Sequence, residues 1–235
     1  MSYFDFLNRI DKKQIKTIFE LGSRDLCDGI KLLNYFEDSK VYSFECNDDC
    51  LIECNKNYIN LEEEKKKNIF LIDKAVSLEN GVISFHPFDL KKYNNMGASS
   101  ILKIDFSIRN IDDDDYNIPN PQREIKVNGI RLDTFIDENY INNIDLLCID
   151  LQGYELNAIK SLGKHLHKVK YIITECSIQP TYINGSTFKE LNEYLNNYNF
   201  KYISSNRFGE YFPNLSITGF SEFDALFINS SAFDM

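Results

Sequence analysis

The segment 144–155, with the sequence IDLLCIDLQGYE, constrains the fold of this chain more than any other stretch. Its apolar run is closed by Asp150, and a helical pattern starts near Gly153. An apolar run of this length that feeds a helix is typical of a buried parallel strand. Ligands of open α/β sheets bind at the carboxyl ends of such strands. We therefore expect the chemistry of this protein near Asp150, with Gln152 and Glu155 in the turn and first helical residues that follow.

Strand-like and helix-like segments alternate along most of the chain. Expected strands cover residues 17–21, 41–44, 69–72, 124–127, 145–150, 170–174, 200–204 and 223–228. Expected helices cover residues 26–36, 48–58, 153–162 and 187–198, and residues 131–133 lead into a further short helix. This alternation predicts one α/β domain over residues 1–235, with a mainly parallel sheet and helices on both of its faces. A short helix over 2–10, within an N-terminal extension 1–16, is expected to cover one end of the sheet.

Two segments interrupt the alternation. Residues 75–77 and 82–85 flank Glu79, Asn80 and Gly81, which is the turn chemistry of a hairpin. The irregular segment 87–121 is long for a loop, so we expect it to form a lid or a wall of the substrate site. Its four aspartates at 112–115 can hold a hard cation, but their spacing is uninformative and favours a solvated acidic loop.

Composition excludes several classes of function. A formal net charge of −10 over 235 residues argues against a nucleic-acid partner. No apolar run approaches the ~20 residues that a membrane-spanning helix needs. The six cysteines lie mostly inside expected strands and helices, so we expect free thiols and a cytoplasmic protein. Cys46, Cys50 and Cys54 recur at helical spacing, but without a CxxC or His partner they favour structural thiols over zinc ligands.

The first strand and its turn suggest a nucleoside ligand. Glu20 and Gly22 mark a tight strand-to-helix turn, and Glu45 lies about where an acid meets ribose hydroxyls in such folds. A GxGxxG fingerprint would require glycine at Arg24 and Cys27, whose side chains would crowd a pyrophosphate. S-adenosylmethionine has no pyrophosphate and suits acidic neighbours. The alternative is that Glu20 and Gly22 only form a tight strand-to-helix turn that binds no ligand.

A family resemblance is carried by motifs in a fixed order: ELGSRD at 20–25, VYSFECN at 41–47, AVS and the following turn at 75–85, GASS at 97–100, RLDTFI at 131–136 and IDLLCIDLQGYELNAIK at 144–160. Over residues 17–202 the chain resembles FkbM-type, S-adenosylmethionine-dependent methyltransferases. The family usually has Glu where this chain has Gln152, and Pro where it has Cys46 and Asp48. The change at Gln152 keeps hydrogen bonding but removes a charge.

The resemblance implies a Rossmann-like class I methyltransferase fold with a seven-stranded sheet. It also implies a cofactor site in which Glu20, Gly22 and Ser23 line the methionine end of S-adenosylmethionine. In this site Glu45 would bind the ribose, and Asp73 and Ala75 would flank the adenine. The other expected cofactor-binding residues are Asp25, Cys46 and Asp150. The implied reaction is O-methylation of a hydroxyl group on a sugar, a glycan or a natural product. The expected partner is thus a small-molecule or glycan acceptor.

Asp150 and Glu175 end two expected neighbouring strands, so they can act as base and orienter or share a divalent ion. The structural alternative is that one caps a helix while the other pairs with Arg131 or a lysine. A divalent metal is possible, but we assign no metal ligands. Expected acceptor-binding residues are Ser99, Ser100, Gln152, Glu155 and Tyr182.

Histidines offer a further candidate base. His86 follows an expected strand beside the 87–121 segment and is included among the catalytic candidates, although a solvated loop histidine is the simpler interpretation. His165 and His167 lie beside lysines and are interpreted as cations at a helix C-terminus. Two other function classes stay open at this point: an oxidoreductase with a nucleotide cofactor, which the missing glycines oppose, and a noncatalytic binding module.

Overall fold

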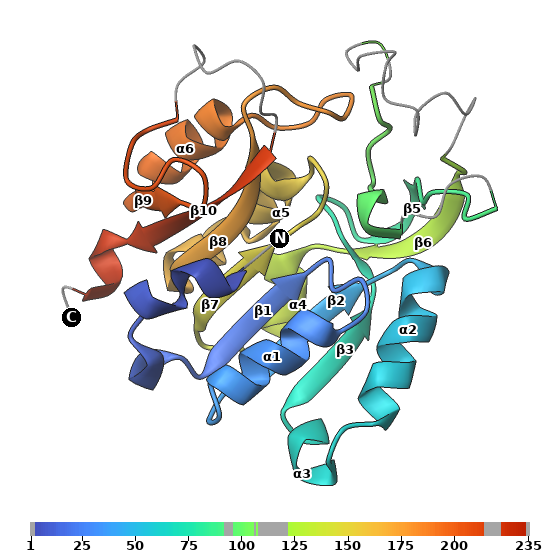
Figure 1. The fold of residues 1–235 in the computed structure, drawn as a ribbon, viewed down its shortest axis with the longest axis horizontal. Helices are drawn as coiled ribbons and strands as arrows, with labels where there is room; N and C mark the ends of the chain where they lie inside the picture. The colour runs from blue at the N-terminus through green and yellow to red at the C-terminus, as the bar shows by residue number, and fades with distance from the viewer. Residues whose placement is uncertain (1–2, 92–95, 106, 108–121, 214–221, 234–235) are drawn as a thin grey trace.

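A computed structural model describes residues 3–91, 96–105, 107, 122–213 and 222–233 (Figure 1). Seven strands form one sheet, in the order β3 (Ile69–Asp73), β2 (Lys40–Glu45), β1 (Thr17–Leu21), β7 (Ile144–Ile149), β8 (Val169–Ser177), β10 (Glu222–Asn229) and β9 (Phe200–Ser205). The first five strands pair in parallel, and β10 runs antiparallel to both of its neighbours. The expected α/β fold with a mainly parallel seven-stranded sheet is confirmed.

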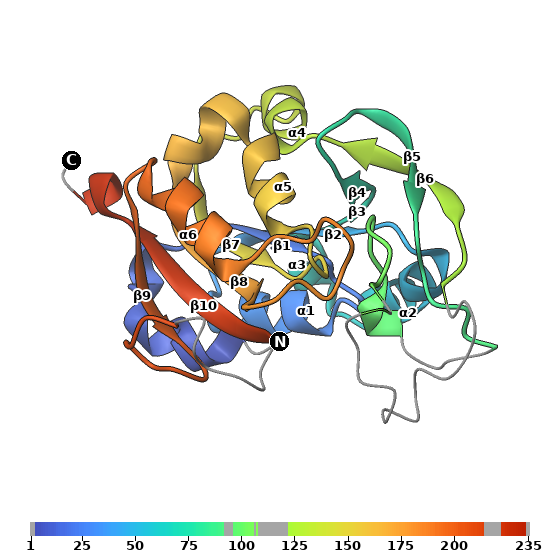
Figure 2. The same cartoon turned by 90° about the horizontal axis from the view of Figure 1, so that it is seen from above.

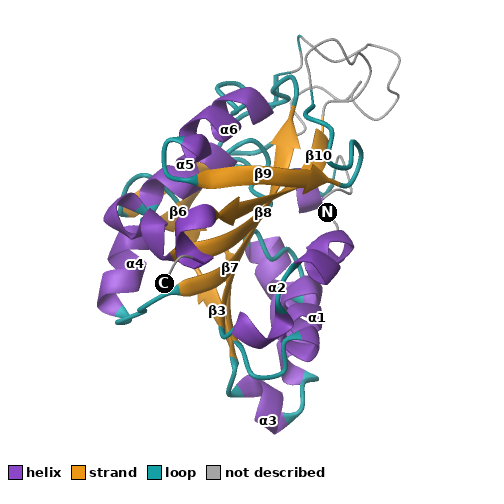
Figure 3. Cartoon of the chain, turned by 90° about the vertical axis from the view of Figure 1, so that its left-hand side faces the viewer, coloured by secondary structure: helices purple, strands orange, loops and turns teal. Residues whose placement is uncertain are grey.

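Helices cover both faces of this sheet (Figures 2 and 3). One face carries α1 (Cys27–Tyr35), α2 (Asp48–Ile59) and the N-terminal 3-10 helix η1 (Tyr3–Arg9), and the other carries α4 (Leu132–Glu138), α5 (Glu155–Ser161) and α6 (Phe188–Asn196). Shorter helices are α3 (Glu63–Lys66), η2 (Lys12–Gln14), η3 (Met96–Ala98), η5 (Gly163–Lys168) and η6 (Ser230–Phe233). No helix among the described residues is long and apolar enough to cross a bilayer.

Side chains of the central strands alternate between two apolar cores. On β7, Leu146 and Cys148 pack on the side of α1, whereas Leu147 and Ile149 pack on the side of α4, α5 and α6. All six residues of this strand are buried. A continuous apolar run is therefore required here, because both faces of the strand lie against helices. The interpretation of segment 144–155 as the central buried strand and its turn is confirmed.

The predicted hairpin is wrong. The two-residue strand β4 (Ala75–Val76) and β5 (Gly81–Phe85) do not pair with one another; they flank β6 (Ile125–Ile130), β4 in parallel and β5 antiparallel. Asn80, in the connecting turn, accepts a hydrogen bond from the Arg131 backbone N–H and donates one to the Thr134 hydroxyl. The turn residues thus bind the β6–α4 junction, a distant segment that local turn chemistry does not reveal.

The N-terminal segment forms the short helix that its spacing predicted, and its type is 3-10. Tyr3, Phe6 and Leu7 are its buried residues, and they pack on the α1 side of the sheet. The same face also receives Ile10. The predicted cover over this part of the sheet is therefore present, built from a tighter helix than expected.

Part of the predicted lid can be placed. Residues 92–95, 106 and 108–121 lie outside the described residues, and with them the four aspartates at 112–115. Two backbone hydrogen bonds join the described part of this segment to the loop after β8. The Asp105 N–H donates to the Thr181 carbonyl oxygen, and the Ile183 N–H donates to the Lys103 carbonyl oxygen. Phe88, Ile104 and Tyr182 form a small apolar cluster beside these bonds. Residues 96–105 thus form a wall next to the loop after β8, and a lid role for the segment stays a prediction.

Asp145 joins the other end of the central strands. Its carboxylate, 1% exposed, accepts hydrogen bonds from the backbone N–H groups of Lys16 and Thr17 and from the Asn143 amide, and lies 2.7 Å from Lys170 Nζ. A buried carboxylate with four donors fixes the start of β1 against β7 and β8.

We predict that Asp145→Ala lowers the free energy of unfolding by about 3–5 kcal/mol, because the partly buried Lys170 ammonium and two backbone N–H groups lose their buried acceptor. Urea unfolding followed by circular dichroism measures this. Asp38 serves as the control: it pairs with Lys16 at 3.0 Å but its side chain is 83% exposed, so Asp38→Ala should cost less than about 1 kcal/mol. Similar losses in the two variants would contradict the role of Asp145.

Candidate functional site

The turn after β1 brings a buried carboxylate to the carboxyl edge of the sheet. Glu20 Oε2 accepts hydrogen bonds from the hydroxyls of Ser23, at 2.9 Å, and Ser43, at 2.6 Å. Gly29 of α1 makes room for this pair, because a Cβ there would lie 2.5 Å from Glu20 Oε2. Burial raises the pKa of Glu20 to about 7, and Asp28 and Asp25 add to this while the two serines oppose it. Glu20 is thus partly protonated at neutral pH.

Glu45 ties the turn after β2 to the turn after β1. Its Oε1 accepts hydrogen bonds from the backbone N–H groups of Cys46 and Asn47, and its Oε2 from that of Arg24, all within 2.9 Å. Burial raises the pKa of Glu45 although these three bonds lower it. Arg24 itself has a left-handed backbone, with φ of 56°, as Leu26 does at 69°. Such conformations cost free energy for residues other than glycine and are typical of functional turns.

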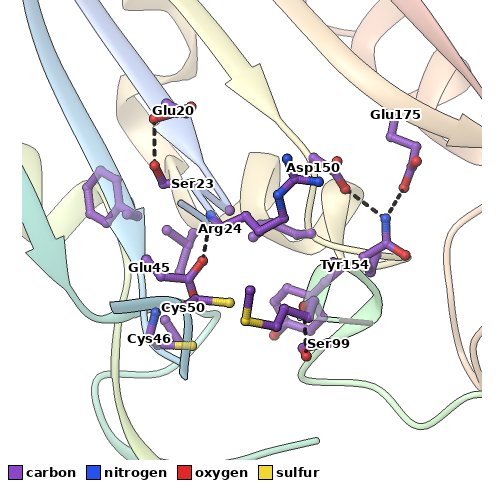
Figure 4. Close-up of a pocket in the computed structure, with 18 of the residues that line it drawn as sticks. Glu20, Ser23, Arg24, Glu45, Cys46, Cys50, Ser99, Asp150, Tyr154 and Glu175 are labelled. Carbon is purple, nitrogen blue, oxygen red and sulfur yellow. Dashed lines mark hydrogen bonds between the residues drawn. The ribbon is translucent and has the colours of Figure 1, made fainter. Parts of the chain in front are cut away.

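Asp150 and Glu175 lie side by side and share a donor. Nε2 of Gln152 is 2.8 Å from Asp150 Oδ1 and 2.8 Å from Glu175 Oε2 (Figure 4). Gln152 has a left-handed backbone, with φ of 54°, and its Oε1 lies 2.8 Å from the Tyr182 hydroxyl. The amide orientation is therefore fixed: its nitrogen faces two carboxyl groups because its oxygen faces a hydroxyl donor.

The two carboxyl groups differ in protonation. Burial raises the pKa of Glu175 well above its usual range, and the charges of Asp150, Glu155, Glu222 and Asp224 raise it further. Burial also raises the pKa of Asp150, but hydrogen bonds from Gln152 and Glu175 lower it. Two carboxylates in one buried site cannot both ionise cheaply. Since burial and neighbouring charges raise the pKa of Glu175 further than that of Asp150, a proton shared by the pair favours Glu175.

Glu155 supports this turn from behind. Its Oε1 accepts hydrogen bonds from the backbone N–H groups of Leu151, at 3.0 Å, and Gly153, at 3.1 Å. The side chain is 3% exposed, and burial raises its pKa to about 7. Gly153 has φ of 92° and its Cα lies against the Tyr182 ring. Glu155 thus holds the turn that presents Gln152.

These groups border a cavity of about 360 Å3, a size typical of small-molecule sites. Of the predicted site residues, those that line it are Glu20, Gly22, Ser23, Asp25, Glu45, Cys46, Ala75, Ser99, Asp150, Gln152 and Glu175. Its other walls include η3 and the side chains of Phe44, Phe85 and Tyr154. The structure thus brings together residues at or next to the ends of β1, β2, β7 and β8.

Five predicted residues lie outside this lining: Asp73, His86, Ser100, Glu155 and Tyr182. His86 is 7% exposed and its Nδ1 is 2.9 Å from the Ile101 carbonyl oxygen, so its interpretation as a solvated loop histidine is wrong. The Ser100 hydroxyl donates to the Leu151 carbonyl oxygen, and the Tyr182 hydroxyl lies 3.0 Å from the Ala98 carbonyl oxygen. Ser100 and Tyr182 therefore position the wall and the turn rather than face the cavity.

His165 and His167 lie in the last turn of η5, the helix C-terminus that the sequence indicated. His165 Nε2 is 2.8 Å from Asp137 Oδ1, and the residue is 5% exposed, so it also joins η5 to α4. The six cysteines are free, and Cys46 and Cys50 line the cavity. Burial raises the pKa of both thiols, which keeps them protonated. Within the described residues, no cluster of three or more His, Cys, Asp and Glu side chains is placed to hold a metal ion.

Several lining residues were not predicted. Tyr154 and Arg24 lie inside motifs that were recognised, and their position in the turns after β7 and β1 was a usable signal. Tyr3 and Glu222 also line the cavity, although they come from the two ends of the chain. No local pattern marks them, because only the folded sheet brings them to this edge.

The cavity fits S-adenosylmethionine. Carboxyl groups at Glu20 and Asp150 suit its cationic ammonium and sulfonium groups, and Glu45 is a hydrogen-bond acceptor suited to a ribose diol. Gly22 has φ of 86°, and a Cβ there would lie 1.9 Å from the Asp150 carbonyl oxygen, so the turn leaves no room for a side chain at this position.

Comparison with known proteins agrees with this fit. The model of the methyltransferase FkbM domain matches residues 25–202. The 2-O-methyltransferase NoeI of Sinorhizobium fredii is 28% identical over 175 residues, which cover 73% of this chain and 67% of NoeI.

One of two similar solved structures supports the fold. The StiE O-MT structure has a TM-score of 0.51 at 8% identity, covering 96% of this chain and 72% of its own. The methyltransferase FkbM of Methylobacillus flagellatus KT has a TM-score of 0.47 at 10% identity, covering 91% of this chain and 43% of its own.

The family match spans most of the chain and includes the turns that carry Glu45, Asp150 and Gln152. The resemblance seen in the sequence is thereby confirmed, and it favours methyl transfer over both an oxidoreductase and a noncatalytic module. The chain belongs to the FkbM methyltransferase family and is a methyltransferase that uses S-adenosylmethionine.

Proposed function

We propose that this enzyme methylates a hydroxyl oxygen of a small-molecule or glycan acceptor, such as a sugar or a natural product. The observation that carries the proposal is the pair Asp150 and Glu175, joined by the Gln152 amide at the edge of the cavity. A hydroxyl nucleophile needs a group that takes its proton during attack. The similarity to a 2-O-methyltransferase supports the choice of oxygen as the methyl acceptor.

The cofactor supplies an electrophilic methyl carbon when bound. The enzyme's own residues would hold the acceptor oxygen in line and take its hydroxyl proton on a carboxylate, and the cofactor would leave as S-adenosylhomocysteine. Asp150 suits this role because Glu175 holds its own proton and donates a hydrogen bond to it. Gln152 keeps both carboxyl groups in place, and positioning of the acceptor oxygen supplies much of the rate.

The remaining roles follow the lining of the cavity. Glu20, Gly22, Ser23 and Asp25 are proposed to border the methionine part of the cofactor, Glu45 and Cys46 the ribose, and Ala75 the adenine. Ser99 and Gln152 are proposed to contact the acceptor, on the wall formed by η3 and the turn after β7. Asp73 is proposed near the adenine through its place at the end of β3, beside Lys74 and Ala75, which line the cavity.

The charge of the chain supports a small-molecule or glycan acceptor rather than a nucleic acid, because its net charge is −10. Six free thiols support a reducing compartment, and we propose the cytoplasm.

The first test concerns the cofactor and Glu20. A cation binds best when Glu20 is ionised, and its pKa of about 7 means that ionisation rises steeply between pH 6 and 7.5. We predict that affinity for S-adenosylmethionine increases roughly five- to tenfold over this range, in which most of the ligand's amino group is still protonated. Isothermal titration calorimetry at each pH measures the dissociation constant.

Glu20→Gln is the matched variant, since its amide cannot titrate. It should bind more weakly at pH 7.5 and lose most of the pH dependence, with circular dichroism showing that the variant is folded. If the dissociation constant of Glu20→Gln changed with pH as strongly as that of the wild type, the pH dependence would belong to another carboxyl group. If the wild type did not bind S-adenosylmethionine at any pH, the cofactor assignment would be contradicted.

The second test concerns Asp150. Because its carboxylate is proposed to take the acceptor proton, Asp150→Asn should lower turnover by about 10²–10⁴ while keeping much of the cofactor affinity. Transfer of a radiolabelled methyl group from S-adenosylmethionine to a panel of free monosaccharides and oligosaccharides supplies the readout. Full activity in a stably folded Asp150→Asn protein would refute the catalytic assignment.

A structural role gives the opposite pattern for this variant, with a lower melting temperature and activity in proportion to folded protein. A metal role gives a third pattern, in which wild-type activity disappears with a chelator and returns with a divalent ion.

A further inference from the structure

Tyr3 lies beside the cavity, although it is distant in the sequence from most of the motifs assigned to the cofactor. It begins η1, is 2% exposed and lines the cavity. It also precedes the family match, which starts at residue 25. Phe6 and Leu7 hold η1 against the α1 side of the sheet, where Cys148 of β7 belongs to the same apolar core. Packing therefore fixes the Tyr3 ring beside the carboxyl ends of the central strands.

The Tyr3 hydroxyl stands among acidic groups. Burial raises its pKa well above 10, and Cys148, Asp150, Glu20 and Asp28 each add to this. The hydroxyl is thus within electrostatic reach of the ends of β1 and β7 and of the first turn of α1. It stays protonated at neutral pH, so it is a hydrogen-bond donor at the methionine end of the proposed cofactor site.

A donor is needed at that end. The methionine part of the cofactor carries an ammonium and a carboxylate, and the carboxyl groups of Glu20, Asp28 and Asp150 suit only the ammonium. An anionic carboxylate placed among acidic side chains requires hydrogen-bond donors.

Most of the donors in the adjacent turn are already used. The N–H groups of Gly22 and Ser23 donate to the Phe44 carbonyl oxygen, and that of Arg24 donates to Glu45. The next two N–H groups, at residues 25 and 26, donate to the Ser23 carbonyl oxygen. The turn after β1 therefore has no free backbone N–H at residues 22–26 to offer a ligand.

Two side-chain donors border the same region besides Tyr3. The Ser23 hydroxyl donates to Glu20. Arg24 extends over the cavity in Figure 4, but its side chain is 59% exposed and its Nη2 lies 3.6 Å from Asp25. Tyr3 and Ser23 are both buried, but the Ser23 hydroxyl is already committed to Glu20, so among these three described donors Tyr3 is the buried one that can turn to a ligand.

We propose that the Tyr3 hydroxyl donates a hydrogen bond to the methionine carboxylate of S-adenosylmethionine, which makes η1 part of the cofactor site. The proposal rests on the use of this cofactor. It adds a positioning residue from outside residues 25–202, which match the family model. It also means that η1, which packs on the sheet, closes the methionine end of the cavity.

The test compares three ligands on Tyr3→Phe, which keeps the ring and removes only the hydroxyl. S-adenosylmethionine and S-adenosylhomocysteine both carry the carboxylate, whereas 5′-methylthioadenosine lacks the whole amino-acid part. Calorimetry should show the dissociation constants of the first two rising about 10- to 100-fold, the range for one hydrogen bond to a charged group. That of 5′-methylthioadenosine should stay within about twofold.

Phe6→Leu is the control, because Phe6 packs η1 on the sheet but does not line this cavity. It should lower the melting temperature and shift the three dissociation constants together. Equal weakening of all three ligands in Tyr3→Phe, or no weakening of any, would overturn the proposal, and retained binding of 5′-methylthioadenosine reports that the variant is folded.

Arg24→Met completes the experiment. If Arg24→Met weakens the two carboxylate ligands while Tyr3→Phe leaves them unchanged, Arg24 alone binds the carboxylate and the proposal is wrong. Failure of the wild type to bind S-adenosylmethionine would instead contradict the cofactor, and the proposal with it.

Discussion

The close approach of two turns determines the geometry of the whole site. The Asp150 backbone N–H donates to the Leu21 carbonyl oxygen, and Gly22 lies so near the Asp150 carbonyl oxygen that only glycine fits. The turn after β1 therefore contacts the turn after β7 directly. The first turn is proposed to bind the methionine end of the cofactor, and the second carries the proposed base. The methyl donor and the methyl acceptor would therefore meet where the two turns touch. Any side chain at Gly22 would push these turns apart.

What the sequence could predict was local. The acids at or next to the ends of β1, β2, β7 and β8 were visible because each belongs to an apolar run with a turn behind it, and parallel strands bring their carboxyl ends to one edge. What it could not predict depended on distant partners. Glu155 was expected to meet the acceptor, but its carboxylate binds the backbone of its own turn. Tyr3 lines the cavity only because η1 packs on the sheet.

The same distinction explains the wrong hairpin. Glu79, Asn80 and Gly81 do form a turn, and Gly81 has φ of 107° as such a turn allows. The strands on either side nevertheless pair with β6, about 40 residues further on. Turn residues specify a change of direction, whereas the pairing partner is chosen by the whole sheet. The small sheet that results places Ala75 and Phe85 on a wall of the cavity.

Gln152 shows how one departure from the family pattern fits its surroundings. Glutamate at this position would add a third carboxyl group between Asp150 and Glu175, with Glu155 close behind it. The amide instead donates to both carboxyl groups and needs no proton of its own. Burial and neighbouring charges raise the pKa of Glu175 further than that of Asp150, so the proton in this cluster favours Glu175, which would separate the proposed roles of the two acids.

The charges around the cavity also select the kind of ligand. Acidic lining residues outnumber basic ones: Glu20, Asp25, Asp28, Glu45, Asp150, Glu175 and Glu222 stand against Arg24 and Lys74. Burial makes several of these carboxyl groups hard to ionise, as the raised pKa values of Glu20, Glu45 and Glu175 show. A ligand with an ammonium and a sulfonium replaces protons in such a site and relieves the repulsion between carboxylates. A pyrophosphate would increase that repulsion. The electrostatics of the cavity thus oppose a dinucleotide independently of the missing glycines at positions 24 and 27.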